Sequence, residues 1–155
     1  MKDTERREGE QNRMELRLPA LSVNEGLARA AVGAFCAELD PTATELADVK
    51  CAVSEAVTNC IVHAYRGREP GDFYITATIS DEGVFCISVR DNGCGIADVE
   101  KAREPLFTTD PEGERSGMGF TVMENFMDSL CVYSGEGKGT VVVMTKCFGK
   151  GTREG

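Results

Sequence analysis

The stretch Ser-Glu-Ala-Val-Thr-Asn-Cys-Ile-Val-His-Ala-Tyr, residues 54–65, constrains the fold of this chain more than any other. Glu55, Asn59 and His63 recur every four residues, a spacing that aligns side chains along one side of an α-helix. Apolar neighbours such as Val53 give that helix a second face, which packs against a core. The stretch therefore predicts a helix with a carboxylate, an amide and an imidazole on one stripe. Taken alone, it also fits an amphipathic helix whose polar side only meets water.

Hydrophobic patterns along the 155 residues predict one domain with the element order β-α-α-β-β-α-β-β. Strands are expected where apolar and polar residues alternate or β-branched residues gather, and helices where apolar residues recur every three or four positions. The order favours an α/β sandwich, in which a mixed and mostly antiparallel sheet is covered on one face by three helices. The expected strands are 14–18, 73–80, 84–91, 130–134 and 140–148, and the expected helices are 22–39, 42–65 and 117–127, with a short helical turn at 97–103.

The polar ends of the chain and the first helix carry further expectations. Residues 1–13 and 149–155 are predicted to be disordered tails on a domain of residues 14–148. Ser22 and Glu25 have the spacing of a capping box at the start of the first helix. The residues expected to form the buried face of that helix are Leu27, Ala30, Ala31, Ala34 and Phe35, which leaves Glu25 and Arg29 on its other side.

Charge and composition exclude several classes of protein. The chain has 17 basic and 26 acidic residues and a net charge of −9, which argues against nucleic acid as a ligand, because phosphate backbones need clustered cations. No apolar run reaches the roughly 20 residues of a membrane span, and the start of the chain has no signal-peptide core. We therefore expect a cytoplasmic protein that does not bind a membrane.

Seven cysteines without a C-x-x-C pair indicate free thiols in a reducing compartment. Cys51, Cys60 and Cys86 lie in apolar patterns and are expected to be buried. Cys60 and His63 have the spacing of two metal ligands on a helix, but the sequence supplies no further pair of ligands.

The segment Asp91-Asn-Gly-Cys-Gly-Ile96 directly follows a predicted strand. Asp-Asn-Gly is by itself a common turn. In an alternative interpretation, Asp91 accepts a hydrogen bond from an exocyclic amine at the bottom of a pocket. Gly93 and Gly95 would then let the backbone approach a flat ring, where a Cβ atom would collide.

A second glycine-rich segment, Gly117-Met-Gly119, opens a predicted helix. Free N–H groups at a helix N-terminus bind phosphate, and the helix dipole assists them. Arg115 would add a cation beside a terminal phosphate. Residues 104–116 have the turn-rich composition of a lid that orders over a ligand.

Four motifs occur in a fixed order: E-x-x-x-N-x-x-x-H, D-x-G-x-G-I, G-M-G-F and G-x-G-T. This order, across residues 14–148, resembles the GHKL ATPase superfamily, whose Bergerat fold is shared by heat-shock chaperones, DNA gyrase, MutL and histidine kinases. Three segments resemble, in their residues as well as in their order, the small anti-sigma serine kinases of spore-forming bacteria. They are residues 54–65, Pro-Leu-Phe-Thr-Thr at 105–109, and residues 114–128.

The resemblance implies specific roles for these residues. Asn59 would coordinate Mg²⁺ at the phosphates of ATP, because an amide oxygen suits a hard cation. Glu55 would be the general base, Arg115 would contact the γ-phosphate, and Asp91 would bind the adenine amino group. His63 is either part of this face or a buried, hydrogen-bonded histidine. The other nucleotide-binding residues implied are Gly93, Gly95, Ile96, Thr108, Ser116, Gly117, Met118, Gly119 and Thr140.

The resemblance also implies a function. It predicts a homodimeric anti-sigma factor that inhibits a sporulation sigma factor and, with Mg-ATP, phosphorylates a serine of an anti-anti-sigma partner. ATP and ADP states would favour different partners, with Glu25 and Arg29 on the surface for which sigma factor and anti-anti-sigma protein compete. Alternatives are a sister kinase for a stress-response sigma factor and a non-catalytic, nucleotide-dependent sigma-binding module. A histidine-kinase fragment would need a phosphoaccepting helical hairpin, and a chaperone-type ATPase would need further domains.

Overall fold

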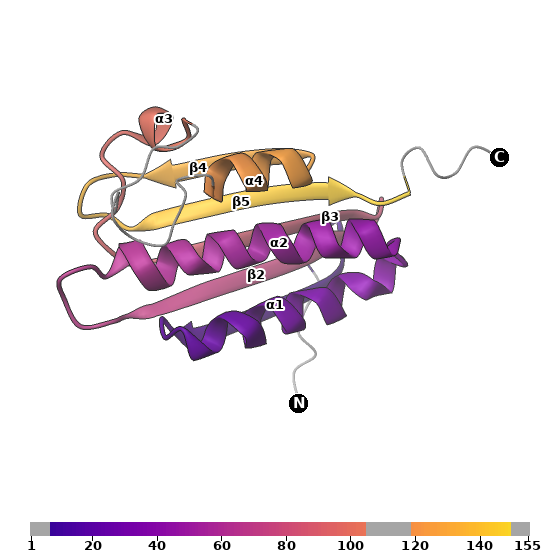
Figure 1. The fold of residues 1–155 in the computed structure, drawn as a ribbon. Coiled ribbons are helices and arrows are strands. Elements are labelled where there is room, and N and C mark those ends of the chain that lie inside the picture. The colour runs from indigo at the N-terminus through magenta and orange to yellow at the C-terminus, as the bar shows by residue number, and fades with distance from the viewer. Residues whose placement is uncertain (1–6, 105–118, 150–155) are drawn as a thin grey trace.

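The computed structural model describes residues 7–104 and 119–149, which form a five-stranded sheet with helices on one of its faces (Figure 1). The predicted α/β sandwich is therefore confirmed. The strands follow the spatial order β1-β2-β3-β5-β4, and each neighbouring pair is antiparallel, so the expected parallel component of the sheet is not found among the described strands. The strands are β1 (Glu10–Pro19), β2 (Asp72–Ser80), β3 (Val84–Asp91), β4 (Ser129–Ser134) and β5 (Thr140–Cys147).

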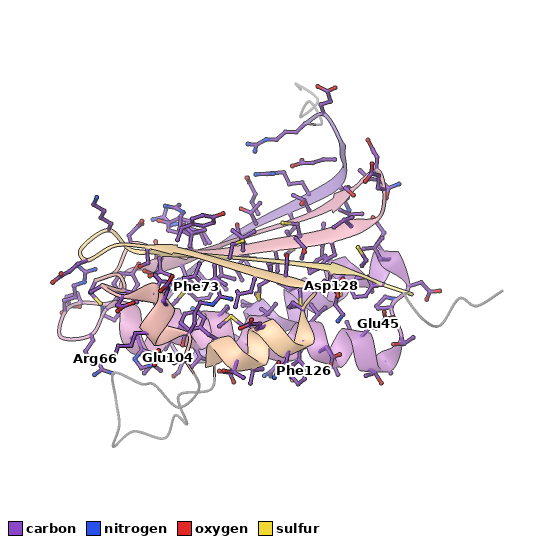
Figure 2. All side chains as sticks on the ribbon, turned by 90° about the horizontal axis from the view of Figure 1, so that it is seen from above. Glu45, Arg66, Phe73, Glu104, Phe126 and Asp128 are labelled. Atoms are coloured by element: carbon purple, nitrogen blue, oxygen red, sulfur yellow. The ribbon has the colours of Figure 1, made fainter. Side chains whose placement is uncertain are left out.

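Three helices cover one face of the sheet, as predicted, and they are α1 (Val23–Cys36), α2 (Ala43–Asn59) and α4 (Gly119–Phe126). Figure 2, a view along the sheet, shows them together on the same side. α2 lies in the middle, with α1 and α4 packed on its two sides. A short helix α3 (Val99–Ala102) lies at the end of the sheet where β3 finishes.

Alternation along the central strands builds the core. In β2, Phe73, Ile75, Ala77 and Ile79 face the helices and are fully buried, while the residues between them face the other side. α2 meets them with Val49, Val53 and Val57, which are also fully buried. Burying a side chain of this size contributes about 1.5–3 kcal/mol, so these positions hold the middle helix flat on the sheet. The core thus fixes the direction of α2 and the polar stripe that it carries.

The predicted 42–65 helix changes its type near its end. It is α-helical to Asn59 and continues as a π-helix, η2 (Cys60–Ala64). π-Helical turns are rare and occur often at functional sites. A 3₁₀ turn, η1 (Ala37–Leu39), joins α1 to α2.

The buried face predicted for α1 was wrong for most of its residues, although Phe35 packs against the core. The helix buries Ala28, Val32, Gly33 and Cys36, whereas Leu27 is 53% exposed. Ala30 and Ala34 are also exposed, and Ala31 and Phe35 are half-buried. Small residues bring α1 close to α2: a Cβ atom on Gly33 would lie only 2.6 Å from Lys50 Cε. Because both sides of α1 are apolar, the spacing alone did not distinguish them.

The capping box lies on a different helix from the one predicted. Ser22 has helical dihedral angles, and its side chain makes no capping hydrogen bond. At the start of α2, Glu45 N–H donates to Thr42 Oγ1 over 3.1 Å, and Thr42 N–H donates to Glu45 Oε1 over 2.9 Å. These bonds lower the pKa of Glu45, the backbone bond from Thr42 being the largest cause.

β1 begins at Glu10 rather than Met14, so residues 10–13, which we predicted to belong to the disordered tail, pair with β2 instead. The polar side chains there lie on a strand at the sheet edge, where alternation of apolar residues is not required. Residues 1–6 and most of the predicted C-terminal tail lie outside the described part of the chain.

All seven cysteines are free thiols. Cys60 is buried as predicted, but Cys86 is half-buried and Cys51 is exposed, because it lies on the solvent side of α2. Among the helices in the described ranges, none is both long enough and apolar enough to cross a membrane.

Candidate functional site

The predicted stripe on α2 faces the start of α4. Glu55 and Asn59 are half-buried and lie one helical turn apart. A Cβ atom on Gly119, the first residue of α4, would lie 3.1 Å from Glu55 Oε2 and 3.8 Å from Asn59 Oδ1. The structure therefore brings the carboxylate, the amide and Gly119, the last residue of the second glycine-rich segment, together. A Cβ atom on Gly119 would require Glu55 Oε2 to move by a few tenths of an ångström.

Asp91, the last residue of β3, is a buried carboxylate. It is 6% exposed and is the one charged residue in the described part of the chain that is classed as buried. Gly93 N–H donates to Asp91 Oδ1 over 2.9 Å. Burial raises the pKa of Asp91, and hydrogen bonds from Gly93 N–H, the Cys60 thiol and Thr140 N–H oppose that rise. A buried carboxylate at the end of the central strand of the sheet suits recognition of a hydrogen-bond donor such as an amine.

The two glycines after Asp91 are needed for close packing. A Cβ atom on Gly93 would lie 2.2 Å from the carbonyl oxygen of Ala64. Gly95 has φ +75°, and a Cβ atom there would lie 1.9 Å from the carbonyl oxygen of Gly135. The loop after β3, residues 91–96, is thus pressed between the end of η2 and the turn between β4 and β5.

Ser134, the last residue of β4 before that turn, links Ile96 to Thr140, which lies opposite Asp91. Ile96 N–H donates to Ser134 Oγ over 2.7 Å, and Ser134 Oγ lies 2.8 Å from Thr140 Oγ1. Gly137 N–H donates to the carbonyl oxygen of Cys94 over 2.6 Å. Thr140 is directly opposite Asp91 in the β3–β5 register. Ser134 was not predicted, because a serine at the end of a strand gives no signal of its own.

α2 and η2 connect the Asp91 cluster to the Glu55 cluster. Cys60, which follows Asn59, lies beside Asp91 and hydrogen-bonds to it, and Cys94 N–H donates to the carbonyl oxygen of Ala64 over 2.7 Å. Asp91 therefore contacts the residue that directly follows Asn59 in the chain. A ligand with one end at Asp91 and an anionic end at the start of α4 would lie along this helix.

His63 is half-buried and hydrogen-bonded. Its Nδ1 lies 3.1 Å from Arg66 Nη2. This contact agrees with the interpretation of a structural histidine better than with a metal ligand. In the described ranges, no three side chains of His, Cys, Asp or Glu gather in a way that could hold a metal ion, which leaves the Cys60–His63 pair without further ligands.

Several predicted site residues lie outside the described residues, together with nearly all of the predicted lid, 104–116. They are Thr108, Arg115, Ser116, Gly117 and Met118. For Mg²⁺, the described residue that fits is Asn59, whose amide oxygen is a hard ligand placed beside a carboxylate and the N-terminus of α4. Magnesium usually keeps several waters and takes one or two ligands from protein, so a full protein cage is not required.

The predicted partner-binding residues form a pair on α1. Arg29 Nη1 lies 2.9 Å from Glu25 Oε1, and the side chain of Arg29 is 45% exposed. Ser54, the neighbour of Glu55 on α2, donates a hydrogen bond to Glu25 Oε1. Glu25 therefore contacts both the exposed arginine and the helix that carries the stripe.

Comparisons with known proteins agree with this geometry. Residues 18–146 match the family model described as a histidine kinase-like ATPase domain. The chain is similar to the anti-sigma F factor of Halalkalibacterium halodurans, with 56% identity over 135 residues that cover 87% of this chain and 92% of that protein. It is 57% identical to the anti-sigma F factor of Clostridium perfringens over 135 residues, 87% of this chain and 96% of that protein.

Solved structures show the same fold. The RsbU and RsbW domains of a Mycobacterium tuberculosis protein align with a TM-score of 0.65 at 19% identity, over 89% of this chain and 33% of theirs. The histidine kinase domain of a blue-light activated kinase from Erythrobacter litoralis aligns with a TM-score of 0.55 at 18% identity, over 81% of this chain and 66% of that one.

Proposed function

The chain belongs to the family of anti-sigma F factors, which are built on a histidine kinase-like ATPase domain, and from this we propose that it is a Mg-ATP-dependent serine kinase. Its substrate would be an anti-anti-sigma protein, and the protein that it inhibits would be a sporulation sigma factor. The name of its relatives, anti-sigma F factor, supports a sigma factor F as the protein that it inhibits.

The observation that carries the proposal is the meeting of Glu55 with Gly119 at the start of α4. The N-terminus of α4 attracts the phosphates. Mg²⁺ held by Asn59 would neutralise charge on the β- and γ-phosphates. The serine Oγ of the partner would attack the γ-phosphorus, the bond to the bridging oxygen of ADP would break, and Glu55 would take the serine proton. A module that only binds nucleotide has no need of a base at this place.

Asp91 would recognise the other end of the nucleotide. Its carboxylate is already held by Gly93 N–H, and its buried position lets an adenine amino group complete its hydrogen bonds. Gly93 and Gly95 let the loop that would border the adenine ring pack against Ala64 and Gly135, and Thr140 lies opposite Asp91. We propose that these residues select adenine and that the Glu55 end acts on the phosphates.

Transfer of labelled phosphate tests this function. The chain is incubated with ATP labelled at the γ-position, magnesium and the anti-anti-sigma protein, and the label is traced after gel separation. We expect the label on a serine of the small partner protein. Nucleotide-dependent sigma binding without any label on the partner would support the non-catalytic module instead, and label on His63 would indicate histidine-kinase chemistry.

The exposed side of α1 is the proposed docking surface. Its apolar side chains Val23 and Leu27 are 77% and 53% exposed, and they lie on the same short helix as Arg29. Arginine is enriched at interface hot spots, where truncation costs about 2 kcal/mol or more. We propose that sigma factor and anti-anti-sigma protein compete for this surface, and that ATP and ADP determine which one remains bound.

Pull-down experiments with Arg29→Ala test the docking surface. We expect weaker capture of both partners, in ATP and in ADP, while nucleotide affinity is unchanged. Arg17→Ala is the matched control, because Arg17 is an exposed arginine paired with Asp72 on β2, away from α1. Wild-type capture of both partners by Arg29→Ala would remove α1 from the docking site.

We further propose that the protein is a cytoplasmic homodimer. Light scattering on the purified chain would measure its oligomeric state.

A further inference from the structure

Tyr65, the residue after η2, has its hydroxyl between two backbone groups. It accepts a hydrogen bond from Asn92 N–H over 2.9 Å and donates one to the carbonyl oxygen of Asp72 over 2.6 Å. The side chain is buried, with 8% of the residue exposed. One hydroxyl thus joins the end of the stripe-bearing helix, the start of β2 and the loop after β3.

The aromatic ring of Tyr65 is held in place as firmly as its hydroxyl. A Cβ atom on Gly71 would lie 2.6 Å from the ring atoms Cε1 and Cζ, so the backbone at Gly71 packs directly against the ring. The Arg68 guanidinium lies 5.3 Å from the ring centre, and its Nη2 donates to the carbonyl oxygen of Asn92 over 2.9 Å. Both backbone groups of Asn92 are therefore fixed, the N–H by Tyr65 and the C=O by Arg68.

Asn92 lies in the chain between Asp91 and Gly93, which are hydrogen-bonded to each other. Before it is the buried carboxylate, and after it is Gly93, whose N–H donates to that carboxylate. Tyr65 and Arg68 hold two consecutive peptide groups, because Asn92 N–H belongs to the Asp91–Asn92 group and Asn92 C=O to the Asn92–Gly93 group. A rotation of the first group would turn the backbone that carries the Asp91 side chain, and a rotation of the second would move Gly93 N–H away from Asp91 Oδ1. The loop contains two glycines, so it has little conformational preference of its own. Its shape must come from contacts outside it.

We propose that Tyr65 is a positioning residue for adenine recognition: its hydroxyl holds the Asp91–Asn92 peptide group and so orients the Asp91 carboxylate. The inference rests on the proposed nucleotide-binding function. Tyr65 itself does not touch the nucleotide in this assignment, since its hydroxyl is occupied by two backbone partners. It acts at the adenine end only and leaves Glu55 and the phosphate end unchanged.

Tyr65→Phe tests the proposal, because it keeps the ring and removes the hydroxyl. Loss of one hydrogen bond that orients the site should weaken both ADP and ATP about 3- to 10-fold in calorimetry. The factor should be equal for the two nucleotides, because adenine is common to them. In phosphoryl transfer, KM for ATP should rise by the same factor while kcat is retained. Tyr133→Phe is the matched control, since Tyr133 is 62% exposed on β4, and it should bind as wild type.

A second variant displaces the Tyr65 side chain without changing Tyr65 itself. Gly71→Ala places a methyl group against the Tyr65 ring and should reproduce the weaker adenine binding, although Gly71 lies in the turn before β2. Amide hydrogen exchange should also quicken at Asn92 and Gly93 in Tyr65→Phe, with the exchange of Ile79, near the far end of β2, unchanged. A structural role alone would quicken both.

These measurements distinguish the role of Tyr65 from nucleotide binding itself. If the wild-type chain binds ADP and Tyr65→Phe binds it equally well, or if the loss falls on kcat rather than KM, the inference about Tyr65 is wrong and the proposed function stands. A wild-type chain that binds no adenine nucleotide would overturn the proposed function and this inference with it.

Discussion

Asp91 shows how a single residue can work against stability and for recognition. Its carboxylate is buried, which is costly for a charged group. The hydrogen bonds from Gly93, Thr140 and Cys60 only partly offset the effect of burial, so the pKa of Asp91 remains raised. A residue kept in such a place is suited to a partner that arrives from outside. We propose that the adenine amino group is this partner.

The first prediction concerns the affinity that Asp91 provides. Asp91→Asn keeps the shape of the side chain and removes its charge, so ATP and ADP should both bind about 10- to 100-fold more weakly, the range expected for a hydrogen bond to a charged group. Calorimetry with each nucleotide measures this. Asp81→Asn, in the exposed turn between β2 and β3, is the control. Unchanged affinity in Asp91→Asn would remove Asp91 from the adenine site.

A second prediction follows from the direction of the pKa shift of Asp91. Because the folded pKa is raised, the folded state binds the proton more tightly than the unfolded chain does. The resulting contribution to stability is fully present below the ordinary aspartate pKa of about 3.9 and is lost as pH rises through the higher folded value. The free energy of unfolding of wild type, minus that of Asp91→Asn, should therefore fall with rising pH in this window. Urea unfolding of both proteins measures the difference, and a difference that rises with pH would contradict the assignment.

Residues of the candidate site differ in how well the sequence announces them. Glu55, Asn59, Asp91, Gly93 and Gly95 stand in motifs, and the structure brings them to two adjoining clusters, although their roles stay predictions. Ser134 and Tyr65 each use a hydroxyl to accept a hydrogen bond from a backbone N–H group that is distant in the sequence, that of Ile96 and that of Asn92. No spacing or composition reveals such a contact, so these residues could be found only from the structure.

At the scale of elements, α1 was predicted as a helix but with the wrong side buried. Its sequence is rich in alanine and glycine, and both of its sides are apolar. The spacing of apolar residues therefore cannot tell the buried side from the exposed side. Close packing on α2 selects the side with Ala28, Val32 and Gly33, because a flat surface lets the helices approach. The large side chains Val23 and Leu27 are left outside. The failure of the pattern therefore identifies the surface that we propose for partner docking.

A third prediction separates the two candidate caps. Thr42→Ala removes one half of the capping box on α2 and should cost about 0.5–2 kcal/mol in the free energy of unfolding. Ser22→Ala, the matched change at α1, should cost less, since the Ser22 side chain makes no capping hydrogen bond. Chemical unfolding of the two variants gives the comparison. An equal loss in both would mean that Ser22 also caps its helix.

The order of elements was predictable from the whole sequence, whereas the order of strands in the sheet was not. β5 enters the sheet between β3 and β4, which sets Thr140 opposite Asp91 and lays the Gly135–Gly139 turn against Gly95. This arrangement depends on contacts between segments about fifty residues apart, which no local pattern records. Figure 1 shows the result, with α3, the β4–β5 turn and the end of η2 gathered at one end of the molecule.

Different parts of the long helix formed by α2 and η2 contact different parts of the molecule. η2 contacts the loop of residues 91–96, the last turns of α2 carry Glu55 and Asn59 toward α4, and Ser54 contacts α1 through Glu25. Nucleotide and partner would therefore act on opposite sides of one rigid helix. We propose that Glu55 on this helix performs chemistry and does not merely shape a pocket.

Single-turnover phosphoryl transfer by Glu55→Gln is the most direct test of that claim. The variant keeps the shape of the side chain and loses the proton acceptor, so transfer from ATP to the anti-anti-sigma protein should slow by about 10²–10⁴-fold. ATP affinity and sigma-factor binding should persist, and Glu82→Gln, in the exposed β2–β3 turn, should react as wild type. Transfer by Glu55→Gln at a rate near that of the wild type would contradict the account, because the serine proton would then go to another group.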